Sequence, residues 1–326
     1  MRHRTPLIVF VMAALVLAGC GSSPSTDPSA RTATLVLDFT PNAIHAGIYS
    51  AIARGYAAAA GVKLHVVAPP ASPDSVKLLE SGRANFAILD IHDLALARQD
   101  GQDIVGIMAI VEHPLAAVIA TPQIRTPAEL QGQTVGVTGD PSDLAVLHSV
   151  VAGAGGDPRR VKTITIGFDA VPALLAHRVA AATAFWNDEG VTLAHDKPGF
   201  HSFRVERYGA PAYPELILCA TAQTVRQDPV LARAVVHSIV RGYRFAVRNP
   251  EGSEADLEQQ VQNLDPRLVA EQLTAELPDF TGPNHIVGEL NHALLERWAR
   301  WEASFGIVKH PPSVDAMFDT KFLPKN

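Results

Sequence analysis

Three short segments of the chain combine aromatic rings with carboxylates, amides and histidines. A small-molecule site needs a flat apolar surface beside a few fixed hydrogen-bonding groups. The Trp186 indole can stack on a planar ring, and the Glu189 carboxylate can accept a hydrogen bond from a ring amine or amidine. These residue types predict a binding site for a planar nitrogen heterocycle. The candidate ligand-binding residues are Asp38, Asn42, His45, Tyr49, Asp90, His92, Trp186, Asn187 and Glu189.

Sequence motifs for other chemistry are absent. The chain has no Gly-x-Ser-x-Gly nucleophile motif, no phosphate-binding loop and no His-Glu-x-x-His zinc motif. Its two cysteines, Cys20 and Cys219, are too few for a disulfide framework or a cysteine–histidine metal cluster. We therefore expect no catalytic residue, no cofactor and no metal. Helix capping is the alternative role for polar residues of this kind, and it suits Asp140 and Ser142.

The elements that would hold these side chains occur twice in the same order. The first set of strands and helices is expected at residues 34–41, 43–60, 62–68, 74–81 and 85–90. The matching set is expected at residues 134–141, 142–153, 161–168, 171–178 and 181–187. Each half reads βαβαβ, which is typical of a doubly wound, mostly parallel sheet. We predict an α/β protein of two lobes with flanking helices.

Ligands of parallel sheets bind beyond the carboxyl ends of the strands. The loops expected to line a cleft between the lobes are residues 38–49, 69–74, 90–93, 138–143 and 186–190. From residue 216 onward a strand and three helices follow without a new sheet, so this part is expected to pack on the first lobe. Lobe 1 is therefore predicted at residues 31–118 and 216–326 and lobe 2 at residues 119–215, with two crossings that form a hinge.

The N-terminus has the features of an export signal. Arg2 and Arg4 precede an apolar run at residues 7–17, which is too short to span a bilayer. The following Leu-Ala-Gly-Cys resembles the bacterial lipobox, in which the cysteine (here Cys20) is lipidated. We predict a signal peptide at 1–19, a flexible tether at 20–30 and an exported protein held to the membrane by lipid. The alternative is an ordinary secretory signal with an incidental cysteine.

Composition narrows the class of protein further. The chain has 326 residues, of which 47% are hydrophobic and 18% charged, and these values are typical of a globular protein. Its formal net charge of −6 argues against nucleic-acid binding through a basic stripe. Cys219 lies in an apolar segment and is expected to be a small core residue. Trp298 and Trp301 are expected to pack in the core as well.

Five motifs together resemble one known family. Residues 38–42 read Asp-Phe-Thr-Pro-Asn, and residues 45–49 read His-Ala-Gly-Ile-Tyr. Residues 184–190 read Ala-Phe-Trp-Asn-Asp-Glu-Gly, residues 208–215 read Tyr-Gly-Ala-Pro-Ala-Tyr-Pro-Glu, and residues 318–324 read Phe-Asp-Thr-Lys-Phe-Leu-Pro. In this order they resemble the ThiY-like solute-binding proteins, which serve ABC importers of thiamine-pyrimidine precursors and are similar in fold to thiamine-pyrimidine synthases.

The resemblance implies a type II-like periplasmic-binding-protein fold that closes on its ligand, acting as a monomer with ABC permease subunits as partners. It also adds Phe39, Gly139 and Tyr213 to the candidate ligand-binding residues. Phe39 replaces a usual tryptophan and Asp188 a common tyrosine, so riboflavin and other heterocycles remain alternatives as ligand. The synthase alternative, with His45 near the reacting centre, requires a cysteine-rich motif near Gly139, and residues 136–143 contain no cysteine. A sensory or adhesion role for the same fold is a further alternative.

Overall fold

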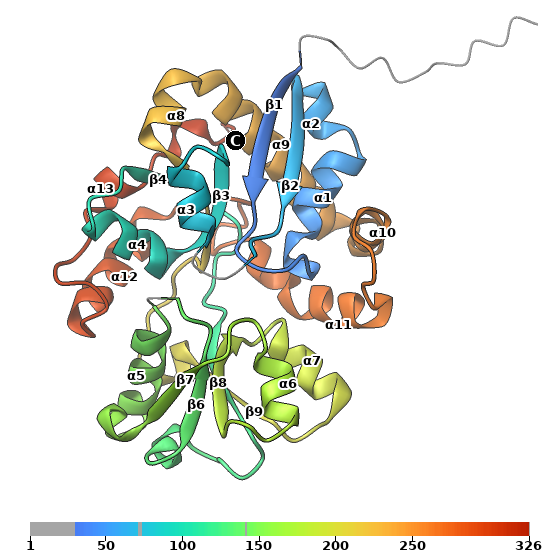
Figure 1. The fold of residues 1–326 in the computed structure, drawn as a ribbon. Coiled ribbons are helices and arrows are strands. Elements are labelled where there is room, and N and C mark those ends of the chain that lie inside the picture. The colour runs from blue at the N-terminus through green and yellow to red at the C-terminus, as the bar shows by residue number, and fades with distance from the viewer. Residues whose placement is uncertain (1–29, 71–73, 141, 326) are drawn as a thin grey trace, which may run out of the picture.

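The computed structural model describes residues 30–70, 74–140 and 142–325, which form two lobes lying one above the other in Figure 1. Each lobe is built on one five-stranded sheet with flanking helices. The predicted α/β fold of two lobes is confirmed. The predicted signal peptide, Cys20 and all but the last residue of the predicted tether lie outside the described residues.

The sheet of lobe 1 has the strand order β2-β1-β3-β10-β4. β1 is parallel to β2 and β3, with Leu35 opposite Phe86, whereas β10 runs antiparallel to β3 and β4. These strands are short apolar runs, and β3 and β10 are buried along nearly their whole length. Their bounds are β1 (Arg31–Val36), β2 (Val62–Val67), β3 (Phe86–Asp90), β4 (Ile104–Ala109) and β10 (Leu216–Thr221).

The sheet of lobe 2 repeats this arrangement in the order β7-β6-β8-β5-β9. β6 is parallel to β7 and β8, whereas β5 is antiparallel to β8 and β9. In both sheets the antiparallel strand is the first one after the chain crosses between the lobes. The bounds are β5 (Ala116–Ala120), β6 (Thr134–Val137), β7 (Lys162–Thr165), β8 (Ala181–Phe185) and β9 (His201–Arg204).

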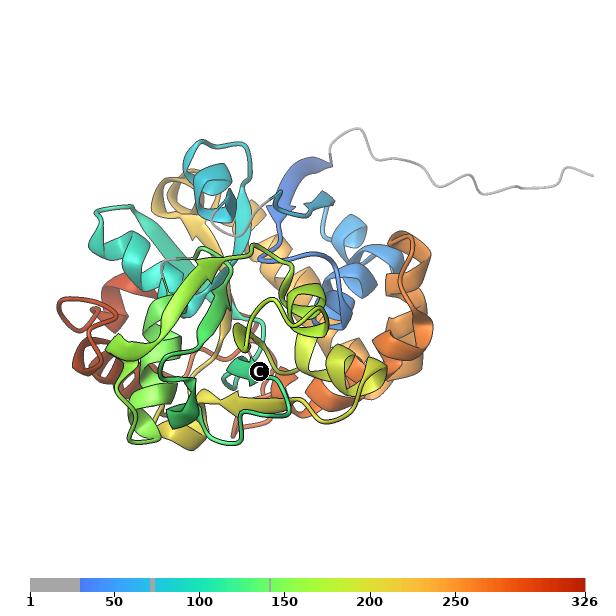
Figure 2. The same cartoon turned by 60° about the horizontal axis from the view of Figure 1, so that its bottom comes forward.

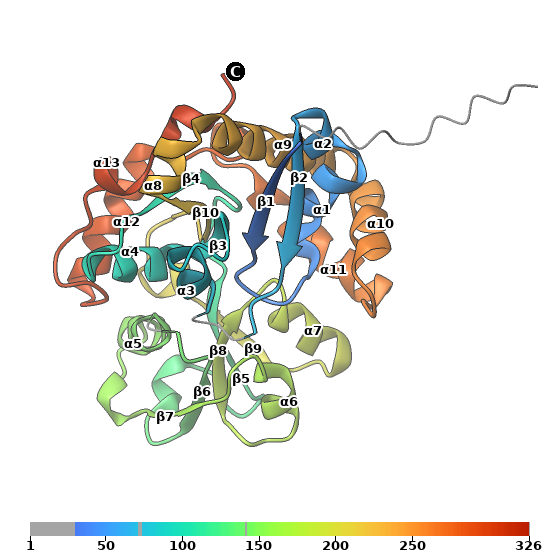
Figure 3. The ribbon, with the colours of Figure 1, turned by 45° about the horizontal axis from the view of Figure 1, so that its top comes forward.

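The helices of lobe 1 lie on both sides of its sheet, with α3, α4, α12 and α13 on one side and α1, α2, α10 and α11 on the other (Figures 1 and 3). The predicted helix at 43–60 is broken, because Gly55 has a φ of 68° and ends α1. The bounds are η1 (Ala43–His45), α1 (Ala46–Ala53), α2 (Tyr56–Ala59), α3 (Asp74–Glu80), α4 (Ile91–Gln99), α8 (Ala222–Gln227), α9 (Pro229–Arg248), α10 (Pro250–Gln260), α11 (Pro266–Glu276), η5 (Leu277–Phe280), α12 (His292–Ser304), α13 (Val314–Met317) and η6 (Thr320–Phe322).

Figure 2 brings lobe 2 forward and shows α5 on the opposite side from α6 and α7. The helices of this lobe are η2 (Pro127–Leu130), α5 (Asp143–Gly153), η3 (Pro158–Arg160), α6 (Ala170–Leu175), α7 (Glu189–Asp196) and η4 (Val205–Tyr208). In the described parts of both lobes, every helix is too short or too polar to cross a bilayer.

A close helix–helix contact holds the loop after β1 in place. A Cβ atom on Gly242 of α9 would lie 1.9 Å from the carbonyl oxygen of Gly47 on α1, so this approach requires glycine. The next residue, Tyr243, is fully buried and donates from its hydroxyl to the carbonyl of Ile44 at 2.7 Å. α9 therefore fixes η1 and, through it, the residues that begin the predicted site.

The chain crosses between the lobes in residues 110–115 and again in residues 209–215. Residues 116–118, predicted to belong to lobe 1, are part of β5 and pair with β8 in the sheet of lobe 2. The first crossing contains one proline, Pro114, and no glycine, and both flanking strands are apolar, so the sequence pattern did not mark this boundary.

Candidate ligand-binding site between the two lobes

A cavity of about 330 Å³ lies between the lobes and is lined by residues of both. This volume is at the lower end of the range for small-molecule sites. Lobe 1 contributes Phe39 after β1 and Asp90 at the end of β3. Lobe 2 contributes Phe185 at the end of β8 and Glu189 at the start of α7. These residues lie at the carboxyl ends of their strands, where the topology predicts a ligand.

Two phenylalanines meet across this cavity. The ring of Phe39 from lobe 1 and the ring of Phe168 from lobe 2 have centroids 4.4 Å apart and planes inclined by 68°. Both rings line the cavity and are half-buried. An edge-to-face pair of this kind is favourable, and it gives the cavity an apolar wall to which each lobe contributes half.

The cavity is strongly acidic. Among its described lining residues Lys77 is the one basic residue, and its ammonium pairs with Asp74 at 3.0 Å. Eight lining residues carry carboxylates: Asp38, Glu80, Asp90, Asp93, Asp100, Asp140, Asp143 and Glu189. Burial raises the pKa of Asp90 and of Asp93, and it raises the pKa of Glu189 to about 8. The chemistry of the lining suits a ligand that donates hydrogen bonds or carries positive charge.

Asp143 organises the loop of lobe 2 at the edge of the cavity. Its Oδ2 accepts from the backbone N–H groups of Gly139 at 2.8 Å and Asp140 at 3.1 Å. The hydroxyls of Thr138 and Thr183 donate to the two oxygens of the same carboxylate. Gly139 has a φ of 109°, which favours glycine, and it is absent from the cavity lining. We therefore expect Gly139 to shape the loop and not to contact the ligand.

His45 and Asn42 order the loop that carries Asp38. The Nδ1 atom of His45 accepts from the Asn42 N–H at 3.2 Å, so its Nε2 atom carries the proton and donates to Asp38 Oδ1 at 3.0 Å. His45 is fully buried, whereas Asp38 reaches the cavity. Tyr49 lies one helical turn further along, where burial raises its pKa to about 12, and it is absent from the lining.

Asn187 and Asp188 join the lobes beside the cavity instead of lining it. The Asn42 side-chain amide donates to Asp188 Oδ2 at 2.6 Å, and Gln272 of α11 donates to the other oxygen. The amide of Asn187 donates to Glu276 Oε2 at 2.8 Å. These contacts hold α7 of lobe 2 against α11 of lobe 1.

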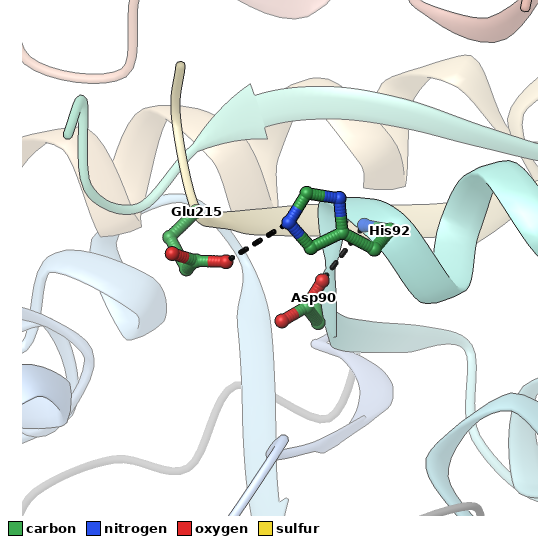
Figure 4. A group of neighbouring side chains, drawn as sticks. All are labelled: Asp90, His92 and Glu215. Carbon is green, nitrogen blue, oxygen red and sulfur yellow. Dashed lines mark hydrogen bonds and ion pairs between the residues drawn. The ribbon is translucent and has the colours of Figure 1, made fainter. Parts of the chain in front are cut away.

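The fully buried side chains of His92 and Glu215 lie next to Asp90 (Figure 4). The Nδ1 atom of His92 is hydrogen-bonded to Glu302 of α12, and its Nε2 atom lies 3.0 Å from the Tyr213 hydroxyl. Burial would lower the pKa of His92, but the carboxylates of Glu302, Asp90 and Glu215 together raise it to about 10. A protonated His92 donates from both nitrogens, so His92 and Tyr213 support the cavity from outside its lining.

Asp90, His92 and Glu215 also have the composition of a metal site, since their donor atoms lie within 4.8 Å of one another. Metal ligation needs a neutral imidazole with a free lone pair. Both ring nitrogens of His92 are already hydrogen-bonded, and one oxygen of Glu215 accepts from two backbone amides. The group is therefore a hydrogen-bonded support of the hinge.

Glu215 connects the two crossing segments. It ends the second crossing. Its Oε2 accepts from the N–H group of Leu115, the last residue of the first crossing, at 2.5 Å and from that of Ala116, the first residue of β5, at 2.8 Å. Its own carbonyl accepts from the Ile91 N–H at 2.9 Å. One buried side chain thus ties both hinge strands to the start of α4, next to Asp90 in the cavity wall.

Trp186 lies outside the inter-lobe cavity. Its indole N–H donates to the carbonyl of Pro114 at 3.0 Å, and the Arg204 guanidinium lies 3.6 Å from the centre of its ring. Trp186 is 7% exposed and borders a separate shallow pocket with Arg204 and Gly190. Because side chains of a strand alternate between faces, Phe185 points into the cavity while Trp186 points away from it.

Of the candidate residues, the structure brings Asp38, Phe39, Asp90 and Glu189 together around the cavity. The others surround it as supports or lie elsewhere, as described above. Sequence reasoning missed Phe168 and Phe185, the two other aromatic residues of the lining. Phe168 ends the predicted strand at 161–168, and a search of every strand end for aromatic residues could have found it.

Glu112 in the first crossing predicts a pH-dependent stability. It is 1% exposed, and neither carboxylate oxygen has a hydrogen-bond partner among the described residues. Burial, with a smaller contribution from Glu289, raises its pKa from 4.5 to about 9. The folded state therefore binds this proton more tightly, and the penalty for ionising Glu112 is absent below pH 4.5 and grows as the pH rises toward 9.

Glu112→Gln is expected to raise the free energy of unfolding by roughly 1–3 kcal/mol at pH 9 and to change it by less than about 1 kcal/mol at pH 5. Urea unfolding at the two pH values measures both quantities. Glu296→Gln, on an exposed face of α12, is the matched control and should show no such pH dependence. Equal effects of Glu112→Gln at both pH values would contradict the explanation.

The two sheets, the crossings and the cavity between them define a protein with the periplasmic-binding-protein fold. The chain belongs to the NMT1/THI5-like family, whose profile matches residues 42–253. It is 31% identical to a formylaminopyrimidine-binding protein of Halalkalibacterium halodurans over 249 residues, covering 75% of this chain and 76% of that protein. The resemblance to ThiY-like proteins is thereby confirmed.

Two further relatives show the breadth of this fold. The chain is 22% identical over 302 residues to a 4-amino-5-hydroxymethyl-2-methylpyrimidine phosphate synthase of Legionella pneumophila, covering 89% of this chain and 92% of that protein. An alkanesulfonate-binding protein of Xanthomonas axonopodis, solved with MOPS bound, superposes with a TM-score of 0.71 at 16% identity over 91% of this chain and all of that one. The latter likeness concerns the fold alone.

Proposed function

We propose that this protein is the solute-binding component of an ABC importer and that it captures a thiamine-type pyrimidine in the inter-lobe cavity. In this proposal it is exported, loses residues 1–19, and is held at the outer face of the membrane by a lipid on Cys20. The permease of the importer is its protein partner. The similarity to a formylaminopyrimidine-binding protein supports the ligand class.

One observation carries the proposal: both lobes line the cavity with groups that could contact the same planar ligand. Phe39 and Phe168 provide a ring surface from opposite lobes, and Glu189 offers a carboxylate from the start of α7. A planar ring packed on the phenylalanines would place an exocyclic amine near this carboxylate. Protonated Glu189 could instead donate to a ring nitrogen, because burial raises its pKa to about 8.

Capture would proceed by hinge closure. A ligand that touches both lobes binds the closed arrangement better than an open one, and its differential affinity shifts the population toward closure. The hydrogen bonds from Asn42 to Asp188 and from Asn187 to Glu276 would form as the lobes meet. No covalent step is required.

The alternative of a synthase has less support in this chain. Residues 136–143 contain no cysteine, and Cys219 is fully buried in β10. His45, the residue considered for the reacting centre, is fully buried and hydrogen-bonded at both nitrogens within its own loop. These positions favour binding over pyrimidine synthesis.

Isothermal titration of the purified protein tests the ligand class. We expect binding of 4-amino-5-hydroxymethyl-2-methylpyrimidine or of its formylaminomethyl analogue with a dissociation constant in the micromolar range or below, about −8 kcal/mol or better. Riboflavin and an alkanesulfonate serve as comparison ligands. Failure of every pyrimidine, together with binding of either comparison ligand, would overturn the proposed ligand class.

A further inference from the structure

A row of basic residues lies along one side of α9. Its members are three or four residues apart, and this spacing places them on the same face of a helix. They are Arg233, His237, Arg241, Arg244 and Arg248. No aspartate or glutamate occurs between Pro229 and Arg248, so nothing within the helix offsets this positive charge. We call these five residues the basic face.

The basic face is turned to solvent and has few counter-charges. Arg233, Arg241 and Arg248 are exposed, and none of the three forms an ion pair with a described residue. Other exposed arginines are paired, since Arg159 and Arg300 lie 2.9 and 3.2 Å from carboxylate oxygens. A surface that gathers several cations without neighbouring anions is suited to an anionic partner.

The first strand begins beside this helix. Arg31, the first residue of β1, pairs with Asp228 at 3.2 Å, and Asp228 caps the N-terminus of α9. α9 packs on α1, α2 and α10, which all belong to lobe 1. Figure 3 shows α9 on the outer side of lobe 1, next to α2. The predicted tether therefore joins the fold at one end of the basic face.

We propose that the basic face of α9 lies against an anionic phospholipid surface when the protein is attached to its membrane. This inference rests on the proposed function for the lipid on Cys20, and it adds a contact that the lipid alone does not provide. The eleven residues 20–30 span at most about 40 Å, so the start of α9 is held within about this distance of the bilayer. A lipid anchor commonly acts together with a basic patch as a second membrane signal.

The charge distribution gives this contact a direction. The chain as a whole has a formal net charge of −6, so an anionic bilayer attracts the basic face and repels most of the remaining surface. Val230, on the same side of α9 at its N-terminal end, is 57% exposed and suits the boundary between headgroups and acyl chains. Lobe 1 would then lie on the bilayer, and lobe 2 would stay free to move in hinge closure.

Vesicle binding tests this contact in the absence of the lipid. The chain from residue 21 onward keeps every described residue and lacks the site of lipidation. Sedimentation with vesicles of about 30% phosphatidylglycerol in phosphatidylcholine, at about 50 mM salt and millimolar lipid, measures its partitioning. We expect binding that falls at least about 10-fold at roughly 500 mM salt and on vesicles of pure phosphatidylcholine, because screening or loss of the anionic lipid removes the attraction.

The combined substitutions Arg233→Gln, Arg241→Gln and Arg248→Gln remove three charges from the basic face. Each arginine near an anionic surface contributes roughly 5-fold to partitioning, so this triple variant should bind at least about 20-fold more weakly. The three side chains are exposed and none lines the inter-lobe cavity, so the melting temperature and the affinity for a pyrimidine should stay nearly unchanged.

The combined substitutions Arg159→Gln, Arg267→Gln and Arg300→Gln are the matched control. They change the net charge by the same amount at exposed positions on η3, α11 and α12. Charges far from the contact are screened, so this variant should bind less than about 3-fold more weakly. An equal loss in the two triple variants would overturn the proposal, because binding would then depend on net charge alone.

Absence of binding to anionic vesicles would also overturn the proposal and would indicate that the basic face serves another anionic partner, such as an acidic segment of the permease. Neither result bears on ligand capture, which the pyrimidine titration tests separately. The proposed ligand class fails if no pyrimidine binds, whatever the vesicles show.

Discussion

Replacing Glu215 with alanine is expected to lower the free energy of unfolding by roughly 3–5 kcal/mol. The substitution removes the acceptor shared by the N–H groups of Leu115 and Ala116, both of which are in buried residues. It also leaves a cavity beside His92, whose cationic ring then loses one of its carboxylate neighbours. Urea unfolding of the ligand-free protein measures the change.

Glu215→Gln separates the hydrogen bonds from the charge. Its amide oxygen can still accept from both N–H groups, and its NH₂ can donate toward Asp90, so the expected loss is only about 1 kcal/mol. If alanine and glutamine variants were equally stable, the two backbone hydrogen bonds would not be what holds the crossings together.

Truncating the aromatic pair should weaken ligand binding by 10- to 100-fold for each ring, or roughly 1.5–3 kcal/mol. Phe39→Ala and Phe168→Ala remove the same kind of surface from opposite lobes, and both rings are half-buried at the cavity. Similar losses from both would show that the ligand contacts both lobes. Calorimetric titration of each variant with the tightest-binding pyrimidine provides the measurement.

Trp186→Phe is the control for these variants. It keeps an aromatic side chain at a position outside the cavity and removes the hydrogen bond to Pro114. We expect a lower melting temperature and an unchanged ligand affinity. A large loss of affinity in Trp186→Phe, with none in Phe168→Ala, would show that the ligand binds at the Trp186 indole instead of at the phenylalanine pair.

The fold could be predicted because it depends on patterns within short stretches of sequence. Apolar runs of strand length alternate with helices, and the order occurs twice, which is enough to indicate two mostly parallel sheets. The boundary of the second lobe was harder to predict, because only three residues, Glu112, His113 and Pro114, separate the apolar run of β4 from that of β5. Glu215 holds the two crossings together, but it does so through a hydrogen bond to Ala116, which lies 99 residues away in the chain, so no local pattern reveals this role.

The sequence predicted which loops form the candidate site better than it predicted which of their side chains line the cavity. Strand ends led to Asp38, Asp90 and Glu189, which reach the cavity. The direction in which a side chain points depends on strand register and lobe orientation, so the sequence could not distinguish Phe185 from Trp186. The roles of His92 and Tyr213 depend on Glu302, which lies 210 residues away from His92 in the chain.

The central claim, that one ligand contacts both lobes at the inter-lobe cavity, is tested most directly by hydrogen–deuterium exchange with and without a saturating pyrimidine. The account predicts slower exchange at residues 37–45 of lobe 1 and at residues 166–170 and 185–189 of lobe 2, with no change near Arg204. Slower exchange confined to one lobe, or only around Trp186 and Arg204, would contradict it.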